Sequence, residues 1–384
     1  MTVATQDRLI GLDALRGLSI AAMILVNNPG DWGHVYAPLR HAEWHGCTFT
    51  DLVFPTFLFV AGASIAPALG FALRRGRTPA ELRVRALRRG AVLVGIGLLL
   101  HSFPWVSFGD GGLFERLWSV RIPGVLQRIG VCYAAAALLY LGLPPARRRV
   151  VLWGALLLYW PLLALSPTPD GGAPDLATRG DHLAGWLDRA VFGAHVWRGG
   201  GGAYDPEGLL STIPALGTAL LGVRCGEVLT GDAPVGDRVR DLLVLGALWT
   251  ALGAVWGWVF PINKALWTSS YAVFTGGIAA TGLGLCTWLA DLRGRRDLLH
   301  PFVVYGRNAL LVFVGSGVLA RILGRMLRVG SGDDAESVQR WFHQHALASW
   351  ADPYVASLLY ALLWVLGWYA VLAWLHRRGW IWRV

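Results

Sequence analysis

The residues best suited to chemistry lie together in one short polar segment, which begins at His41 and reads HAEWHGCTFTD. Imidazole exchanges protons readily near neutral pH, so His41 and His45 are candidate general bases. Trp44 and Asp51 are candidate substrate contacts, although Trp44 equally suits a membrane interface and Asp51, like Thr48, equally suits a helix cap. The two histidines are four residues apart and could share a metal ion in a helix, but no third ligand is evident, so we expect no metal.

A second set of polar residues lies in an apolar run at residues 12–28, LDALRGLSIAAMILVNN. Asp13 and Arg16 are three residues apart and share one face of a helix. Asn27 stands near the other end of the same helix, where its amide could donate a hydrogen bond. The ion pair is equally expected of a helix end at a membrane surface, and Asn27 is equally typical of a helix terminus.

Three further segments place charged residues in or beside apolar runs. Arg128, in RIPGVLQR, lies about 10 Å along a helix from Arg121 and so within the hydrocarbon, where a charge costs about 2.5–3.5 kcal/mol. It is a candidate ligand for an anionic group, or one half of a buried ion pair. Glu207, in YDPEG, is typical of a helix start and is otherwise a carboxylate facing the substrate. Lys264, the only lysine, suits either a membrane interface or a substrate contact.

Arg307 and Asn308 lie in another apolar run, near its predicted inner end. They could bind the phosphates of a ligand that enters from the cytoplasm, or Asn308 could bridge two helices. The sequence holds no G-x-x-x-x-G-K-[ST], H-E-x-x-H, G-x-S-x-G or C-x-x-C motif, which argues against the nucleotide, zinc, serine-hydrolase and thiol chemistries of those motifs. Of the four cysteines only Cys47 lies outside an apolar run, so we expect no disulfide.

The elements that must position these residues are predicted to be membrane-spanning helices. The 384 residues are 55% hydrophobic and 15% charged, with a mean hydropathy of +0.48, which excludes an ordinary soluble enzyme and a disordered chain. We predict an all-α, polytopic membrane helix bundle that forms a single transmembrane domain over residues 1–384. Ten runs approach the length that crosses a bilayer, within a range of nine to eleven. They are 12–28, 52–73, 90–107, 122–143, 150–166, 207–229, 242–259, 268–290, 300–325 and 353–375.

The arginines predict how the bundle is oriented. With the N-terminus inside, the inside connections hold 18 Arg in 52 residues, whereas the outside connections hold nine Lys or Arg in 112 residues. Cytoplasmic loops are enriched in Lys and Arg, so we place both termini in the cytoplasm and His41 outside. This clustering accounts for the net charge of +10, so we expect the lipid bilayer as a partner and no nucleic acid. Only about seven residues precede the first run, so we expect no removable signal peptide.

Taken together, these segments resemble the heparan-α-glucosaminide N-acetyltransferase family of transmembrane acyltransferases and its bacterial relatives. The matching stretches occur in order along most of the chain, and the one from His41 to Pro55 is the most specific. They are D-x-L-R-G at 13–17 with V-N at 26–27, H-x-x-W-x-G-x-T-x-x-D-L-V-F-P at 41–55, R-I-P-G-V-L-Q-R at 121–128, Y-D-P-E-G at 204–208, K-A-L-W-T-S-S-Y at 264–271 and G-R-N at 306–308.

The resemblance implies that cytoplasmic acetyl-CoA donates an acetyl group to the amine of an amino sugar, such as glucosamine, on the outer side. By the family's motifs His41 is the active histidine and Asn27 the assisting asparagine. His41 acts either as a base or as an acetylated intermediate. The expected ligands of CoA are Arg16, Arg128, Arg307 and Asn308. The expected contacts of the acceptor are Trp44, Asp51, Glu207 and Lys264. The resemblance further implies a homodimer, and we place the chain in the bacterial inner membrane.

An amino-sugar or oligosaccharide transporter is the alternative from another functional class. Many spans and intramembrane arginines suit it equally well. Transporters often contain inverted repeats with broken helices, and the two halves of this sequence show no clear symmetry, which weighs against this alternative. A scaffold without chemistry would leave the polar residues at both faces unexplained.

Overall fold

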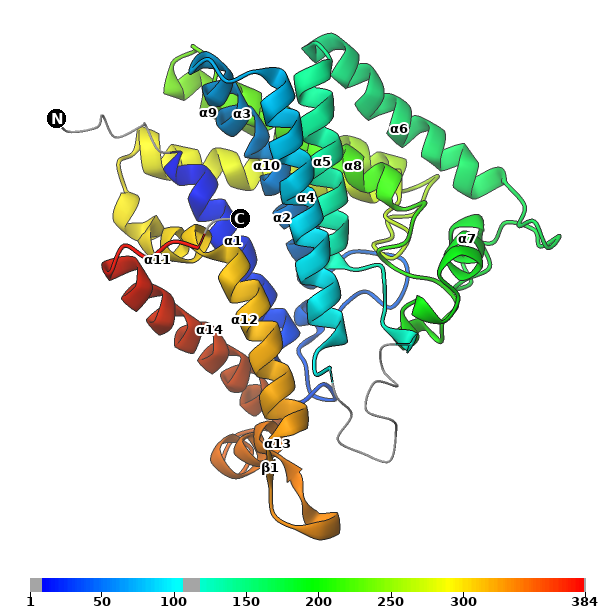
Figure 1. The fold of residues 1–384 in the computed structure, drawn as a ribbon, viewed down its shortest axis with the longest axis vertical. Helices are drawn as coiled ribbons and strands as arrows, with labels where there is room; N and C mark the ends of the chain where they lie inside the picture. Colours follow the sequence, from blue (N-terminus) through cyan, green and yellow to red (C-terminus); the bar gives the residue numbers. More distant parts are fainter. Residues whose placement is uncertain (1–8, 106–117, 383–384) are drawn as a thin grey trace.

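The computed structural model describes residues 9–105 and 118–382, which form an almost entirely helical bundle (Figure 1). Within these ranges one short antiparallel pair occurs, β1 Arg328–Val329 with β2 Glu336–Ser337. Nine helices of the described ranges are long and apolar enough to cross a membrane. The prediction of an all-α polytopic bundle is therefore confirmed.

The helices follow one another with few long connections. In chain order they are α1 Ile10–Asn27, α2 Phe49–Ala63, α3 Ile65–Arg74, α4 Pro79–Ser102, α5 Val125–Gly142, α6 Pro145–Leu165, α7 Leu183–Phe192, α8 Thr212–Leu229, α9 Val235–Trp256, α10 Ser269–Thr287, α11 Arg296–Arg307, α12 Ala309–Arg321, α13 Val338–Phe342 and α14 Pro353–Arg377. Three of the spans are longer than one helix, because α3 continues α2 and π-helical turns at Trp288–Leu292 and Ile322–Met326 continue α10 and α12.

Two of the predicted runs differ from what the structure contains. The described part of the run 90–107 contains only the second half of α4, which ends at Ser102, and residues 106 and 107 lie outside the described residues. The first half of α4 carries the arginine cluster of residues 83–89, so α4 is long but not apolar enough to count among the nine. The run 300–325 is not one helix, because the backbone leaves helical geometry at Asn308 (φ −123°, ψ 35°) and divides it into α11 and α12. The prediction of a continuous helix there was wrong.

Glycines bring α1 against α11 closely enough to fix the position of the break. A Cβ on Gly17 would lie 1.7 Å from the carbonyl oxygen of Phe302, and a Cβ on Gly306 would lie 2.1 Å from that of Asp13. Both helices therefore need glycine at this crossing, as close-packed membrane helices commonly do. The crossing holds Arg16 of α1 and Arg307 of α11 at the same level of the bundle.

Successive spans alternate in direction, so the connections gather at two ends of the bundle (Figure 1). The basic end carries the connections that follow α3, α5, α8 and α10. The loop end carries residues 28–48, 166–211, 257–268 and 328–352, including α7 and α13. The polar segment that begins at His41 is therefore on the loop end.

Candidate active site

A histidine–aspartate pair forms at the start of α2. Thr48 caps this helix, and Asp51 at its third position completes a capping box, so the helix-cap alternative is correct for both residues. The buried carboxylate of Asp51 accepts hydrogen bonds from the backbone N–H groups of Ala42 (2.9 Å) and Thr48 (3.1 Å). Its other oxygen lies 2.6 Å from Nδ1 of His41. Asp51 was predicted to contact substrate, but in this geometry it lies beneath His41 and orients it.

The contact with Asp51 fixes which nitrogen of His41 carries a proton. A carboxylate that already accepts two N–H groups presents only an acceptor, so Nδ1 of a neutral His41 carries the hydrogen and Nε2 keeps its lone pair. The side chain of His41 is 52% exposed, whereas that of Asp51 is 1% exposed. The imidazole therefore presents a basic nitrogen on an accessible ring whose other nitrogen is held from below, which is the arrangement of a general base or nucleophile.

Lys264 reaches the same pair from the connection between α9 and α10. Its Nζ lies 3.1 Å from Nδ1 and 3.3 Å from Nε2 of His41, and 3.6 Å from Oδ1 of Asp51. Burial lowers the pKa of Lys264, while the carboxylates of Asp51 and Glu207 act in the opposite direction. The tertiary fold thus brings together three of the residues that the sequence singled out.

Trp44 and His45 contact residues other than the pair of His41 and Asp51. The indole N–H of Trp44 donates to the carbonyl of Leu176 (2.7 Å), and its ring packs against His182 and Tyr204 of the loop end. The ring of His45 lies 3.3 Å from the amide nitrogen of Asn263. His41 and His45 are thus directed to different partners, and the described residues contain no cluster of three potential metal ligands.

Glu207 and Arg128 belong to a buried polar network beside the pair. Arg121 bonds the carboxylates of both Asp205 and Glu207, and burial, which alone would raise the pKa of Glu207, is outweighed by the nearby Arg121 and Arg128. Arg128 donates to the backbone carbonyls of Pro206 (2.9 Å) and Gly208 (3.0 Å). The prediction that Arg128 binds CoA finds no support in this geometry, because its guanidinium holds the turn before α8.

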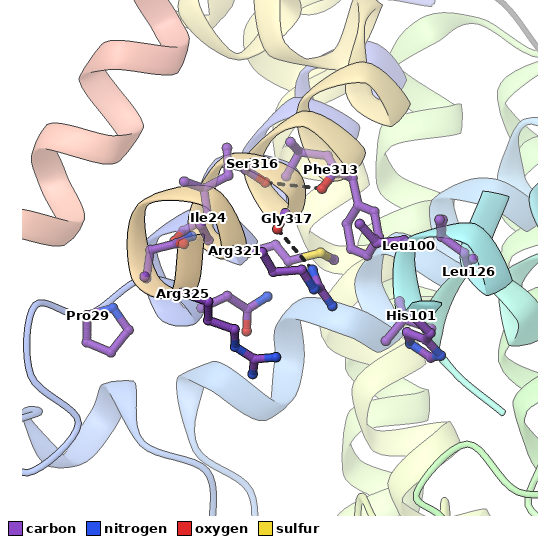
Figure 2. Close-up of a pocket in the computed structure, with 18 of the residues that line it drawn as sticks. Ile24, Pro29, Leu100, His101, Leu126, Phe313, Ser316, Gly317, Arg321 and Arg325 are labelled. Atoms are coloured by element: carbon purple, nitrogen blue, oxygen red, sulfur yellow. Dashed lines mark hydrogen bonds between the residues drawn. The ribbon is translucent and has the colours of Figure 1, made fainter. Parts of the chain in front are cut away.

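A cavity of about 440 Å³ opens near the loop end, between α1, α4, α5 and α12. Asn27, which is exposed, lines it together with the partly buried His101 and the buried Gln127. Figure 2 shows Arg321, the last residue of α12, and Arg325, in the π-helical turn that follows it, extending into this space opposite Leu126 and His101. Its lining residues do not include His41, so the structure does not bring the two predicted catalytic residues into one cavity.

A second cavity, of about 700 Å³, opens near the basic end. Four arginines line it, and one carboxylate, that of Asp13, lies among them. The arginines are Arg16, Arg85, Arg89 and Arg307. Arg16 bonds Asp13 (2.8 Å) and the hydroxyl of Ser64 (2.7 Å). Leu126 lines both cavities, so the two lie in series along α1, α4, α5 and α12.

Asn308 does not line the basic cavity, although its neighbours do. Its amide nitrogen donates to the carbonyl of Trp380 (3.2 Å), and its amide oxygen accepts from the N–H of Trp382 (2.8 Å). The prediction of Asn308 as a CoA ligand is therefore not supported, since both ends of its amide hold the C-terminal segment. That segment in turn brings Trp382 to the cavity wall.

Arg85 and Arg89 are cavity residues that the sequence reading missed. The arginines of residues 74–89 were interpreted only as a sign of orientation. Arg85 and Arg89 are four residues apart and so share one face of α4, which is the signal that could have singled them out.

Comparison with known proteins shows what the chain is similar to. A sequence profile described as "Heparan-alpha-glucosaminide N-acetyltransferase, catalytic" matches residues 8–180. The chain is 31% identical to heparan-alpha-glucosaminide N-acetyltransferase of Mus musculus over 371 residues, covering 82% of this chain and 54% of that protein. It is also 31% identical to the Homo sapiens protein of the same name over 370 residues, covering 82% of this chain and 53% of that protein. The chain is thus similar to heparan-α-glucosaminide N-acetyltransferases over most of its own length.

The family match and the site overlap only in part. The chain spans about half the length of these two relatives. The matched residues 8–180 contain Asn27, the pair of His41 and Asp51, and all but one of the arginines of the basic cavity. Lys264 and Arg307 lie beyond the residues that the profile matches, and the tertiary structure places Lys264 beside His41 and Arg307 in the wall of the basic cavity.

Proposed function

We propose that this chain is a membrane acetyltransferase that moves an acetyl group from cytoplasmic acetyl-CoA to the amine of an amino sugar at the outer face. The observation that carries the proposal is the pair of His41 and Asp51, because an accessible imidazole held by a buried carboxylate can remove the proton that an attacking amine must lose. Similarity to relatives that are named as glucosaminide N-acetyltransferases supports the reaction type and the acceptor class.

The basic cavity is the proposed entry site of acetyl-CoA. Phosphate groups are bound best by guanidinium groups, and Arg16, Arg85, Arg89 and Arg307 surround this cavity with a single carboxylate among them. The loop-end cavity lies in series with the basic cavity, so a donor bound by its phosphates at the basic end could extend its thioester toward Asn27. In the positive-inside orientation, with both termini in the cytoplasm, the basic cavity faces the cytoplasmic supply of acetyl-CoA.

The proposed chemistry starts with an amine that is mostly protonated at neutral pH and must lose a proton before it attacks. In the direct route Nε2 of His41 takes that proton, the C–N bond forms, the C–S bond breaks, and the departing thiolate of CoA takes the second proton, which the nitrogen loses as the amide forms. In the two-step route Nε2 first attacks the thioester and displaces the thiolate of CoA, which takes the proton of the ammonium group. The amine then attacks the acetyl carbon, the bond to Nε2 breaks, and the second proton of the nitrogen passes to the released imidazole. Asn27 lines the donor cavity, which favours hydrogen bonding to the thioester oxygen over bonding to His41.

The transfer also requires the two parts of the site to meet. His41 lies outside the lining of the loop-end cavity that Asn27 lines. The connecting residues 28–40 are tied to α14, where the N–H of Gly30 donates to the carbonyl of Ser357 (3.2 Å) and that of Asp31 donates to its hydroxyl (3.1 Å). Because His41 and Asn27 do not share a cavity, the proposed reaction cycle includes a shift of residues 28–40 that releases these two hydrogen bonds.

The experiment that tests the proposal supplies membranes with labelled acetyl-CoA and glucosamine. We expect His41→Ala and Asn27→Ala to lose most of the transfer, by about 10²-fold or more for His41, while the protein still inserts and folds. His45→Ala is the matched control, because His45 lies in the same segment but contacts Asn263. Turnover by His41→Ala at the wild-type rate would contradict the proposed base.

A transporter of amino sugars is a second candidate, because one observation favours it. The break between α11 and α12 at Asn308 lies next to the basic cavity, and broken helices at a binding site are common in transporters. Uptake of labelled glucosamine into vesicles without any acyl-CoA would support that function. Uptake that requires acetyl-CoA, with N-acetylglucosamine as product, supports the acetyltransferase.

A further inference from the structure

Lys264 contacts His41 in a way that leaves the basic nitrogen of the imidazole free. Its Nζ is almost equally distant from Nδ1 (3.1 Å) and Nε2 (3.3 Å). A group on the lone-pair axis of Nε2 would lie far from Nδ1, on the opposite side of the ring. The in-plane position at Nδ1 is taken by Asp51, 2.6 Å away. The ammonium therefore lies against the ring, and the Nε2 lone pair is not its acceptor.

The charge of Lys264 acts on the protonation of His41 in the opposite sense to Asp51. The carboxylate of Asp51 stabilises an imidazolium, whereas a cation 3.1 Å from the ring destabilises it. A general base has to be neutral before it can take a proton, so a carboxylate alone would orient the ring but also favour its resting protonation. A second charge of opposite sign would remove that cost.

Resting on the function proposed above, we infer that Lys264 is a positioning residue whose positive charge keeps His41 in its neutral, proton-accepting form. The side chain does not touch the acceptor in this role and acts only through the imidazole. This replaces the interpretation of Lys264 as a substrate contact.

The other ionisable groups around the pair leave these two charges dominant. The thiol of Cys47 is uncharged, because burial raises its pKa to about 12. Glu207 bonds Arg121, which compensates its charge. The phenol of Tyr271, on α10, donates to the backbone carbonyl of Asp51 (2.6 Å) and brings no charge. Among the described residues, Asp51 and Lys264 are the charged groups that contact the ring of His41.

The expected size of the effect follows from Coulomb's law. Because the His41 side chain is half exposed, a water-like dielectric applies, and two unit charges at this separation interact by the equivalent of about one pH unit. The acid side of the pH–activity profile should therefore move upward by about one unit, with about tenfold less activity below it.

The test compares pH–activity profiles of Lys264→Met and Lys264→Arg with that of the wild type. We expect Lys264→Met to show the upward shift and Lys264→Arg to retain the wild-type position of the acid limb. An acid limb that stays in place in Lys264→Met, with activity on the plateau, would overturn the inference. If His41→Ala remains active, the proposed function itself fails, which separates the two outcomes.

A measurement on the wild-type protein covers the case in which Lys264→Met fails to fold. Lys264 is the only lysine in the chain, so an amine-reactive label, located by peptide mass spectrometry, reports its protonation directly. We expect labelling at Lys264 to rise with pH only above the acid limb of the activity profile. Labelling that rises at the pH of the acid limb, or at lower pH, would mean that the amine is uncharged where His41 works, and the inference would be wrong.

Discussion

Replacing Asp51 by Asn tests the proposed base most directly, because the substitution keeps the shape of the side chain while it removes the charge and reverses the hydrogen bond to His41. One oxygen of Asp51 accepts from the backbone N–H groups of Ala42 and Thr48, and the other faces Nδ1 of His41. An amide has one oxygen and one NH₂ group. The oxygen is held by the two N–H donors, so the NH₂ group has to face His41.

This orientation reverses the tautomer of the imidazole. With an NH₂ donor opposite Nδ1, that nitrogen has to accept, and the proton moves to Nε2. The nitrogen that should take the proton of the amine then carries one already. General-base catalysis contributes about 10²–10⁴-fold, so we expect Asp51→Asn to lose that factor in kcat, or about 2.7–5.5 kcal/mol of transition-state stabilisation.

The assay measures initial rates of labelled acetyl transfer together with thermal stability in detergent. Asp51→Asn should melt close to the wild type, because its oxygen still caps α2. Thr48→Ala is the control: it removes a capping hydroxyl worth about 1 kcal/mol but leaves the contact between His41 and Asp51 in place, so activity should stay close to wild type. An Asp51→Asn variant with more than a tenth of wild-type turnover would refute the reasoning.

Three further predictions test the remaining parts of the site. Arg85→Gln and Arg89→Gln should each raise the KM for acetyl-CoA by about tenfold, which is the effect of losing about 1.4 kcal/mol from one charge-assisted hydrogen bond. Arg88→Gln, on the same helix but outside the cavity lining, is the control and should leave the KM unchanged. Equal KM values in all three variants would contradict the basic cavity as the donor site. Arg128→Met should lower the free energy of unfolding by about 2–4 kcal/mol, because the carbonyls of residues 206 and 208 lose their donor. A chemical denaturation midpoint equal to that of the wild type would contradict the role of Arg128 in holding the turn before α8. Asn308→Ala should release the C-terminal segment, measured as faster proteolysis after α14 with little change in melting temperature; an unchanged cleavage rate would show that the segment is held elsewhere.

Local sequence determined the class of fold and the surfaces on which chemistry could occur. Long apolar runs must satisfy their backbone as helices in a bilayer, and this requirement acts within each run, so the sequence predicts most of the spans. The break at Asn308 escaped that reading because hydropathy stays high across it. At the break the side-chain amide of Asn308 bonds the backbone of the C-terminal segment, which is distant in the sequence.

The sequence alone also singled out His41, Asn27, Asp51 and Lys264, since charged or polar groups beside apolar runs are costly enough to be conspicuous. Only the tertiary structure decided their partners. Lys264 reaches His41 across 223 residues of chain, and Arg128, equally conspicuous, instead holds the turn before α8. Residue type and spacing fix where a charge must be compensated, but which group compensates it depends on how the helices pack, and that depends on contacts between residues far apart in the chain.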